Sequence, residues 1–262
     1  MGHALGDAAV QVMEKGRYRV RPAATEADLD AAQRLRHRAF AADRPDAAPE
    51  GRDADPFDAR CTHALVEEIA TGRLVCCFRL LALADGARIG ESYSAQYYEL
   101  SPLADFGGPI VEMGRFCVDP GTRDPDILRI AWAALTRHVD ATGVKLLFGC
   151  ASFKGTDAAA YLDAFAMLKE RHLGPKRWRP RVKAPDVFRF AARLRRRPDA
   201  RLAMRRMPPL LKSYLMMGGW VSDHAVVDAE MDTLHVFTGV EVGAIPPARK
   251  RLLRAVAQES GR

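Results

Sequence analysis

Two kinds of segment are missing from this chain of 262 residues. No stretch approaches the roughly 18 consecutive apolar residues that a membrane-spanning helix needs. The N-terminal segment has no basic region followed by an apolar core, so a secretory signal is not predicted. We therefore expect a cytoplasmic or membrane-peripheral protein.

Paired cysteines and clustered metal ligands are also missing. The five cysteines are scattered and contain no C-x-x-C pair, which favours free thiols in a reducing compartment. The seven histidines show no ligand-like spacing with one another or with the cysteines, so we expect no metal site. Cys117 is a candidate nucleophile, but we interpret it as a small apolar core residue, because free cysteine is among the most buried residue types.

The patterning of the chain predicts an α/β or α+β layered fold, because strand-like and helix-like segments alternate in the second half. We expect a flexible leader at residues 1–16, a core at 17–190 and a basic C-terminal extension at 191–262 packed on that core. An acidic loop rich in Asp, Pro and Gly runs from Asp43 to Ala59, and long loops of this kind are usually functional or disordered. The strands that the patterning predicts are 18–21, 62–67, 74–81, 110–118 and 145–148, with two more within 223–242; the predicted helices begin near Thr25, Asp126, Thr156, Leu210 and Ala248.

The strand at 110–118 carries two charged residues in an apolar run, IVEMGRFCV. Burying an unpaired charge costs free energy, so Glu112 and Arg115 either form an ion pair or have a functional role. Residues three apart point to opposite faces of a regular strand. A bulge at Gly114 would bring both to one face, and we predict such an interruption because a glycine inside a strand often marks a bulge.

The positive charge of the chain is concentrated in one segment. The formal net charge is +7, and the run from Lys176 to Arg206 contains only Asp186 and Asp199 to oppose its many basic residues. Such a segment favours an anionic partner: an acidic protein, an anionic membrane surface or nucleic acid. A solvated basic face without a partner is the alternative.

An ordered set of charged and aromatic motifs resembles a known superfamily. The motifs are Arg36-x-x-x-Phe40, Asp55-Pro56-Phe57-Asp58, Phe78-Arg79-Leu80-Leu81 and Glu112-Met113-Gly114-Arg115-Phe116. In this order they resemble the acyl-homoserine lactone synthases within the GNAT acyltransferase superfamily. Three further fragments are closer to the bacterial ornithine N-acyltransferases of ornithine-lipid synthesis: Cys61-Thr62-His63, Phe148-Gly149-Cys150-Ala151-Ser152-Phe153 and Pro208-Pro209-Leu210-Leu211-Lys212-Ser213-Tyr214.

The resemblance implies a GNAT-like fold, a mixed central sheet with two splayed strands flanked by helices. It implies transfer of a 3-hydroxyacyl chain from acyl carrier protein to the α-amine of L-ornithine, giving lyso-ornithine lipid. No separate cofactor is expected, because the phosphopantetheine arm enters as part of the donor. Residues 122–127 lack the glycine-rich loop with which many GNAT enzymes hold the pyrophosphate of coenzyme A, which favours a carrier-protein donor. We interpret Asp126 in this loop as a helix cap.

Site roles follow from the residue types and from the resemblance. We predict Glu112 as the catalytic base, with Arg115 orienting it or binding a carboxylate; a purely structural ion pair between them is the alternative. Asp55 and Asp58 are candidates for the cationic groups of ornithine, and Arg36 or Arg79 for its carboxylate. Plain salt bridging on the surface is the alternative for all four. The remaining predicted substrate-binding residues are Phe40, Phe116, Cys150 and Ser152.

The basic segment has a candidate partner in the acidic acyl carrier protein, which Arg193, Arg195, Arg196 and Arg197 would attract. Peripheral association with an anionic membrane competes with this hypothesis. Nucleic acid is not expected, because no recognisable binding motif is present. The rival functions are an acyl-homoserine lactone synthase, which would take S-adenosylmethionine as acceptor, and a non-catalytic module that binds carrier protein or membrane.

Overall fold

The computed structural model describes residues 10–41 and 50–259. These residues form two compact units, each assembled from separate stretches of the chain. The first unit comprises residues up to 82, residues 113–144 and residues from 247 onward; the second comprises residues 83–112 and 145–246. The division into a leader, a core and an extension stays a prediction. However, the strand at 233–241, which the sequence placed in the extension, pairs with residues 146–154, which the sequence placed in the core.

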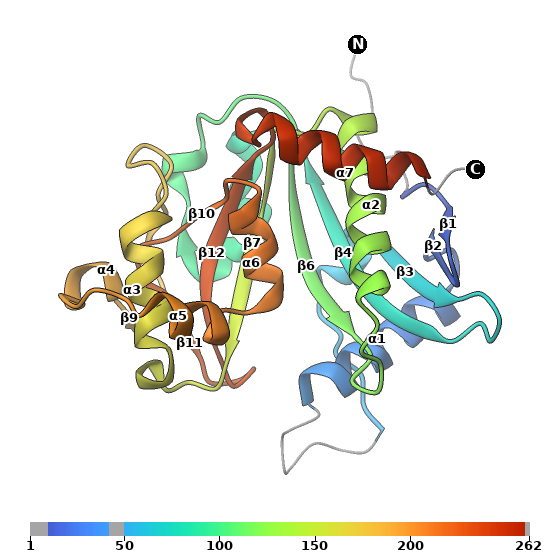
Figure 1. The fold of residues 1–262 in the computed structure, drawn as a ribbon, viewed down its shortest axis with the longest axis horizontal. Coiled ribbons are helices and arrows are strands. Elements are labelled where there is room, and N and C mark those ends of the chain that lie inside the picture. Colours follow the sequence, from blue (N-terminus) through green and yellow to red (C-terminus); the bar gives the residue numbers. More distant parts are fainter. Residues whose placement is uncertain (1–9, 42–49, 260–262) are drawn as a thin grey trace. The chain divides into compact units, whose positions relative to one another are not determined.

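The first unit is a sheet with three helices (Figure 1). Its strands lie in the order β1-β2-β3-β4-β6, and β1 to β4 pair antiparallel. The elements are β1 (Met13–Lys15), β2 (Tyr18–Pro22), α1 (Glu26–Ala41), β3 (Thr62–Glu68), β4 (Leu74–Leu83), the second part of β6 (Ile110–Val118), α2 (Pro125–Thr142) and α7 (Pro247–Glu259). The predicted flexible leader was too long, because Met13–Lys15 form β1 and the Met13 side chain is buried; residues 1–9 lie outside the described residues.

Local chemistry explains where the helices of this unit begin and end. Thr25 and Asp28 exchange side chain to backbone hydrogen bonds of 3.1 and 3.2 Å, which confirms the predicted capping box of α1. At the start of α2 the cap is Asp124, whose carboxylate accepts from the Asp126 amide at 2.9 Å, so the prediction of Asp126 as the cap was wrong. Gly143 ends α2 with a φ of +68°, a left-handed conformation that glycine adopts readily.

The second unit is a sheet in the order β6-β7-β12-β11-β9, with β10 paired to β12 and with β5 and β8 forming a separate two-stranded sheet. The strands are β5 (Tyr98–Glu99), the first part of β6, β7 (Leu146–Lys154), β8 (Arg181–Val182), β9 (Val187–Phe188), β10 (Trp220–Val221), β11 (Ala225–Asp228) and β12 (Thr233–Glu241). The helices are α3 (Leu162–Arg171), α4 (Phe190–Arg193), α5 (Ala200–Arg206) and α6 (Pro209–Met216). Their apolar faces enclose a core that includes Phe153, Phe165 and Phe190.

The parallel ladder between β6 and β7 is short, and its end positions a predicted site residue. It joins Ile110–Glu112 to Leu146–Phe148 and stops there, although β7 continues to Lys154 along β12. Early separation of two neighbouring strands is what the GNAT-like fold predicted. Glu112 therefore lies at the last residue pair of the ladder.

The predicted interruption in β6 lies at Arg115 rather than at Gly114. Arg115 has a φ of +53°, in the left-handed region that residues other than glycine seldom adopt. Backbone conformations of this kind cluster at functional sites, where the surroundings hold them in place. The regular alternation of β6 therefore breaks one residue after Gly114.

Candidate active site

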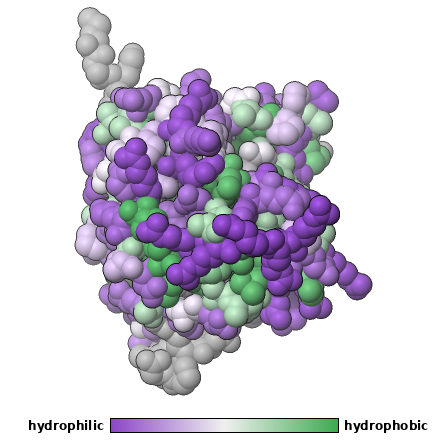
Figure 2. All heavy atoms as spheres, turned by 90° about the vertical axis from the view of Figure 1, so that its left-hand side faces the viewer, coloured by the Kyte–Doolittle hydropathy of each residue, from purple (hydrophilic) through white to green (hydrophobic). Residues whose placement is uncertain are grey.

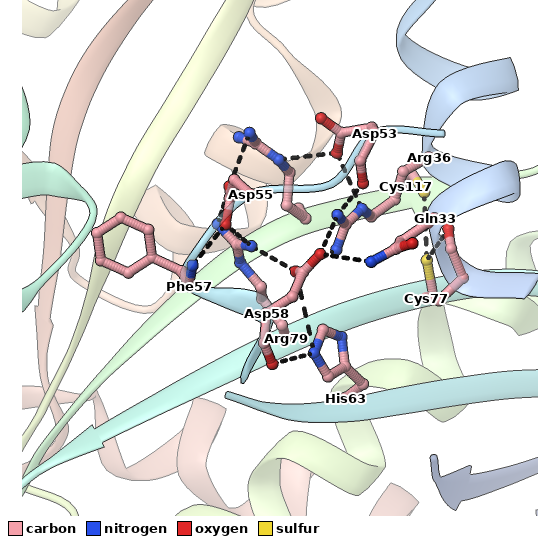
Figure 3. Close-up of polar contacts among 12 residues, drawn as sticks. Gln33, Arg36, Asp53, Asp55, Phe57, Asp58, His63, Cys77, Arg79 and Cys117 are labelled. Atoms are coloured by element: carbon pink, nitrogen blue, oxygen red, sulfur yellow. Dashed lines mark hydrogen bonds and ion pairs between the residues drawn. The ribbon is translucent and has the colours of Figure 1, made fainter. Parts of the chain in front are cut away.

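A network of arginine and aspartate side chains is buried in the first unit (Figure 3). Asp58 is at its centre and accepts from Arg36 at 2.7 and 2.8 Å, from Arg79 at 2.6 Å and from Gln33 at 3.0 Å. Arg36 and Arg79 expose only 1% and 3% of their surfaces. Two guanidinium groups in an interior of low polarity are stable only when paired in this way.

Asp55 joins Arg79 to Arg115 within the same network. Its carboxylate accepts two hydrogen bonds from Arg79, at 2.6 and 2.7 Å, one from Arg115 at 3.0 Å and one from the Phe57 amide at 2.9 Å. Burial raises the pKa of Asp55, but the hydrogen bonds from Arg79 and the charge of Arg115 outweigh it and hold that pKa below its usual value. The pKa of Asp58 is lowered in the same way, chiefly by Arg36 against the effect of burial. Both carboxylates are ionised at neutral pH.

The acceptor positions of Asp55 and Asp58 are filled by these donors, because a carboxylate has about four lone-pair sites. A positioning role therefore fits both residues better than the predicted direct contact with ornithine. Arg36, Arg79, Asp55 and Asp58 are salt-bridged to one another, but within a buried network and not on the surface, where the sequence's alternative had placed their salt bridges.

Asp53 completes the network, and sequence reasoning missed it. Its Oδ2 lies 2.9 Å from the Nε atoms of both Arg36 and Arg115. Its side chain is 15% exposed. The alternation Asp53-Ala54-Asp55 in the acidic loop was the pattern that could have identified it.

The carboxylate of Glu112 is held differently, by uncharged groups of the second unit. Its Oε1 accepts from the Ser94 amide at 2.8 Å and from the Ser94 hydroxyl at 2.5 Å, and its Oε2 accepts from the Tyr93 amide at 2.7 Å. Glu112 is 4% exposed and Ser94 is fully buried. Because an ionised carboxylate only accepts hydrogen bonds, three convergent donors match the charged form of Glu112.

Two of the motifs that are distant in sequence meet near Glu112. The Cys150 sulfur lies 3.4 Å from the Ser94 hydroxyl, and burial raises the pKa of Tyr214, with further contributions from the nearby Cys150 and Glu112. Sequence reasoning missed Tyr93 and Ser94. Tyr93 precedes and Ser94 begins a single-turn helix, 94–96, which is too short to show a periodic pattern. Ser152 is exposed and pairs in register with His235 of β12.

The other predicted site residues have structural surroundings of their own. Phe116 stacks on Phe78 with ring centroids 5.5 Å apart, and Phe40 packs against the apolar cluster beneath α1. Cys117 is buried 3.6 Å from the Cys77 sulfur, and that contact, with burial, raises its thiol pKa well above the usual value. The shared use of Glu112 and Arg115 stays a prediction, since the two residues belong to different units.

The predicted carrier-protein residues all lie at the surface of the second unit, at and after the end of α4. The Arg195 side chain donates to the Ala192 carbonyl at 2.6 Å, and Arg196 pairs with Asp163 at 2.8 Å. The side chains of Arg193 and Arg197 have no hydrogen bond or ion pair to another residue that the structure describes. Among residues 10–41 and 50–259, no group of three or more His, Cys, Asp or Glu is placed to hold a metal ion, and no helix is long and apolar enough to cross a membrane.

Comparison with known proteins identifies the family of this chain. The family model for the acetyltransferase (GNAT) domain matches residues 35–133. An L-ornithine N(alpha)-acyltransferase from Rhodobacter capsulatus is 35% identical over 87% of this chain and 91% of its own length. The chain belongs to the L-ornithine N(alpha)-acyltransferase family. Another relative of that name, from Rhizobium meliloti, is 30% identical over 86% of this chain and 80% of its own.

A solved structure is similar over most of the chain. It is an N-acyl amino acid synthase from uncultured soil microbes, with 13% sequence identity and a TM-score of 0.48 over 94% of this chain and 99% of that one. The GNAT-like α/β fold predicted from the sequence is confirmed.

Proposed function

We propose that this protein transfers a 3-hydroxyacyl group from acyl carrier protein to the α-amine of L-ornithine, giving lyso-ornithine lipid. The observation that carries the proposal is the buried Glu112 carboxylate, which three neutral donors hold in its acceptor form. The names of the relatives support ornithine as the acceptor.

Glu112 would act as the general base. The amine attacks the thioester carbon only when its nitrogen lone pair is free, so a proton must leave that nitrogen before or during attack. The carbon–nitrogen bond forms, the carbon–sulfur bond breaks, and the carrier protein leaves as its thiol. Glu112 takes the amine proton, directly or through a water molecule, and the departing sulfur is protonated in turn.

A direct transfer is favoured over an acyl-cysteine intermediate. A cysteine attacks as the thiolate, and the raised pKa of Cys117 keeps it protonated at neutral pH. Cys117 is also packed among the apolar side chains of Ala32, Leu35 and Leu65, as expected of a core residue.

The acceptor's charges have candidate partners at the rim of the Arg–Asp network. Asp53 keeps 15% of its side chain exposed, and a partly exposed carboxylate suits an ammonium group. Arg115 keeps 13% of its side chain exposed and could take the acceptor carboxylate. Arg36, Arg79, Asp55 and Asp58 would hold these two residues in place.

A carrier-protein donor is supported by charge. The exposed arginines from Arg193 to Arg197 would attract a strongly acidic protein and raise the association rate at low salt. The carboxylate of Asp124 already caps the amino end of α2, where the pyrophosphate of coenzyme A would otherwise bind.

The proposal is tested by measuring release of free carrier-protein thiol from 3-hydroxyacyl carrier protein. The purified protein is given ornithine, lysine, glutamine or S-adenosylmethionine in separate reactions, with a reaction lacking acceptor as the control. We expect release that depends on ornithine, with N-acylornithine identified by mass spectrometry. The proposal would be rejected if thiol were released only with S-adenosylmethionine. It would also be rejected if none of the four acceptors supported thiol release while carrier protein still bound.

A further inference from the structure

A pocket of about 630 Å³ in the second unit is lined mainly by basic residues. The charged residues of the lining are Lys176, Arg177, Arg179, Arg181, Arg189, Asp105 and Asp223. Five positive and two negative side chains leave an excess of three positive charges (5 − 2). We propose that this pocket is a binding site for a phosphate group.

The frame of the pocket is built by hydrogen bonds rather than by loose side chains. Strands β5 and β8 pair Glu99 with Arg181. Arg179 donates from both Nε and Nη2 to the Gly174 carbonyl, at 3.0 and 2.7 Å, and the Ala191 amide donates to the Asp223 carbonyl at 3.1 Å. The backbone that carries the cations is therefore fixed before any ligand arrives, which reduces the entropic cost of binding.

Several of the cations lack a partner of opposite charge. The side chains of Lys176 and Arg189 make no hydrogen bond or ion pair with another described residue, and both residues are exposed. Arg181 contacts Glu99 only at 3.4 Å, and the Arg177 guanidinium lies 4.9 Å from the centre of the Trp178 ring rather than against a carboxylate. Uncompensated cations that line one concave surface concentrate anions there.

The chemistry of the lining favours phosphate over a single carboxylate. Arginine presents a planar set of donors that matches the oxygens of a phosphate, and four of the five cations are arginines. A phosphate carries up to two negative charges against the excess of three. Figure 2 shows the side of the protein that carries α3 and α4 in Figure 1, where hydrophilic surface predominates.

Two sources supply this chemistry: a soluble phosphate compound and the headgroup of an anionic phospholipid. The site differs from the predicted carrier-protein residues, since none of Arg193, Arg195, Arg196 and Arg197 lines the pocket. The inference also stands apart from the proposed acyl transfer, because phosphate binding is measured without acyl donor or acceptor.

The test is isothermal titration of the full chain with inorganic phosphate at constant ionic strength. We expect saturable binding that the Lys176→Gln/Arg189→Gln double variant weakens by at least about tenfold, because the variant lacks two charged donors of the lining. The matched control is Arg123→Gln/Arg251→Gln, which removes two exposed positive charges from the first unit and should leave the dissociation constant unchanged. Melting temperatures establish that both variants fold.

A vesicle experiment distinguishes the two sources. If the pocket variant also loses binding to phosphatidylglycerol vesicles, relative to phosphatidylcholine, and free phosphate competes, the source is a lipid headgroup. If vesicle binding is unchanged while phosphate binding falls, the source is soluble. Absence of saturable phosphate binding, or equal weakening in the pocket and control variants, would overturn the proposal. Ornithine-dependent thiol release by the same variants reports separately on the acyl transfer.

Discussion

The two units hold buried carboxylates in different ways. In the first unit, Asp53, Asp55 and Asp58 are neutralised by arginines, so that charge cancels charge within the network. In the second, the carboxylate of Glu112 accepts hydrogen bonds from two amides and a hydroxyl, which orient it. The aspartates that are paired with arginines help to define the structure, whereas the oriented carboxylate of Glu112 is suited to accept a proton.

This contrast predicts that the largest effect on activity comes from Glu112. Glu112→Gln keeps the size of the side chain but removes the base, and it places an amide donor opposite groups that also donate. General-base catalysis contributes about 10²- to 10⁴-fold, so kcat for ornithine-dependent thiol release should fall within that range. Glu170→Gln, at an exposed carboxylate on α3, is the matched control and should leave kcat unchanged. Unaltered activity of Glu112→Gln would remove the support for a base at this position.

Removing a charge from the Arg–Asp network should affect stability instead. Arg79→Met preserves apolar volume but leaves Asp55 and Asp58 without one of their partners. Breaking a buried pair on one side costs about 3–5 kcal/mol, and we expect a loss of that size in urea unfolding.

The control for this prediction is Arg34→Met, because Arg34 pairs with Asp30 at the surface of α1. Exposed pairs are worth about 0–1 kcal/mol. If Arg34→Met and Arg79→Met cost the same free energy, the network contributes no more than surface ion pairs do.

Acid should destabilise the protein in two pH ranges. The upper range involves histidines of both units, because burial lowers the pKa of His63, in the first unit, as well as that of His235. Burial lowers the pKa of His235 to about 4, so between pH about 6.5 and 4 the unfolded chain binds a proton that the folded chain does not. Stability should therefore fall as the pH falls through this range, by roughly 3 kcal/mol. In the first unit, the lowered pKa values of Asp55 and Asp58 give stability that is complete above pH about 4 and is lost at lower pH.

Urea unfolding at pH 7, 5 and 4 checks the first range. His235→Gln cannot titrate and should flatten the pH dependence between pH 7 and 4, whichever variant is more stable at neutral pH. A dependence as steep as in the parent chain would place the responsible group elsewhere.

Much of the fold could be predicted from local patterns. The nine apolar and charged residues of β6 have the predicted bounds, and α2 is centred on the predicted face with Ile127, Ile130 and Leu135 buried. Prediction was weaker where pairing with a distant strand decides how long a strand is. β7 extends six residues past Phe148 because β12 pairs with it throughout. The prediction of a flexible leader was wrong at residues 13–15 for the same reason, because these residues form β1 by pairing with β2.

The candidate site was predictable where it consists of charged residues in recognisable motifs. Arg36, Asp55, Asp58 and Arg79 were found in this way, and the structure brings all four into one network. Their roles were not predictable, because whether a carboxylate has an oxygen to spare depends on donors that arrive from distant parts of the chain. Ser94 was missed because a neutral hydroxyl in an aperiodic stretch has no distinguishing pattern until Glu112 is placed beside it.

Ser94 therefore provides the smallest but most specific test of the comparison. Ser94→Ala removes the hydroxyl that donates to Glu112 at 2.5 Å and leaves both backbone donors in place. We expect kcat to fall by about tenfold with little change in KM, because a hydrogen bond to a charged group is worth roughly 1.5–3 kcal/mol and two donors still orient the carboxylate. Ser213→Ala, at an exposed hydroxyl on α6, is the control.

A positioning role also predicts that the pH profile of kcat moves toward higher pH, since one bond that favours the ionised carboxylate is lost. A fall in kcat without that movement would indicate a purely structural contribution, and Glu112 would then be held by its backbone donors alone.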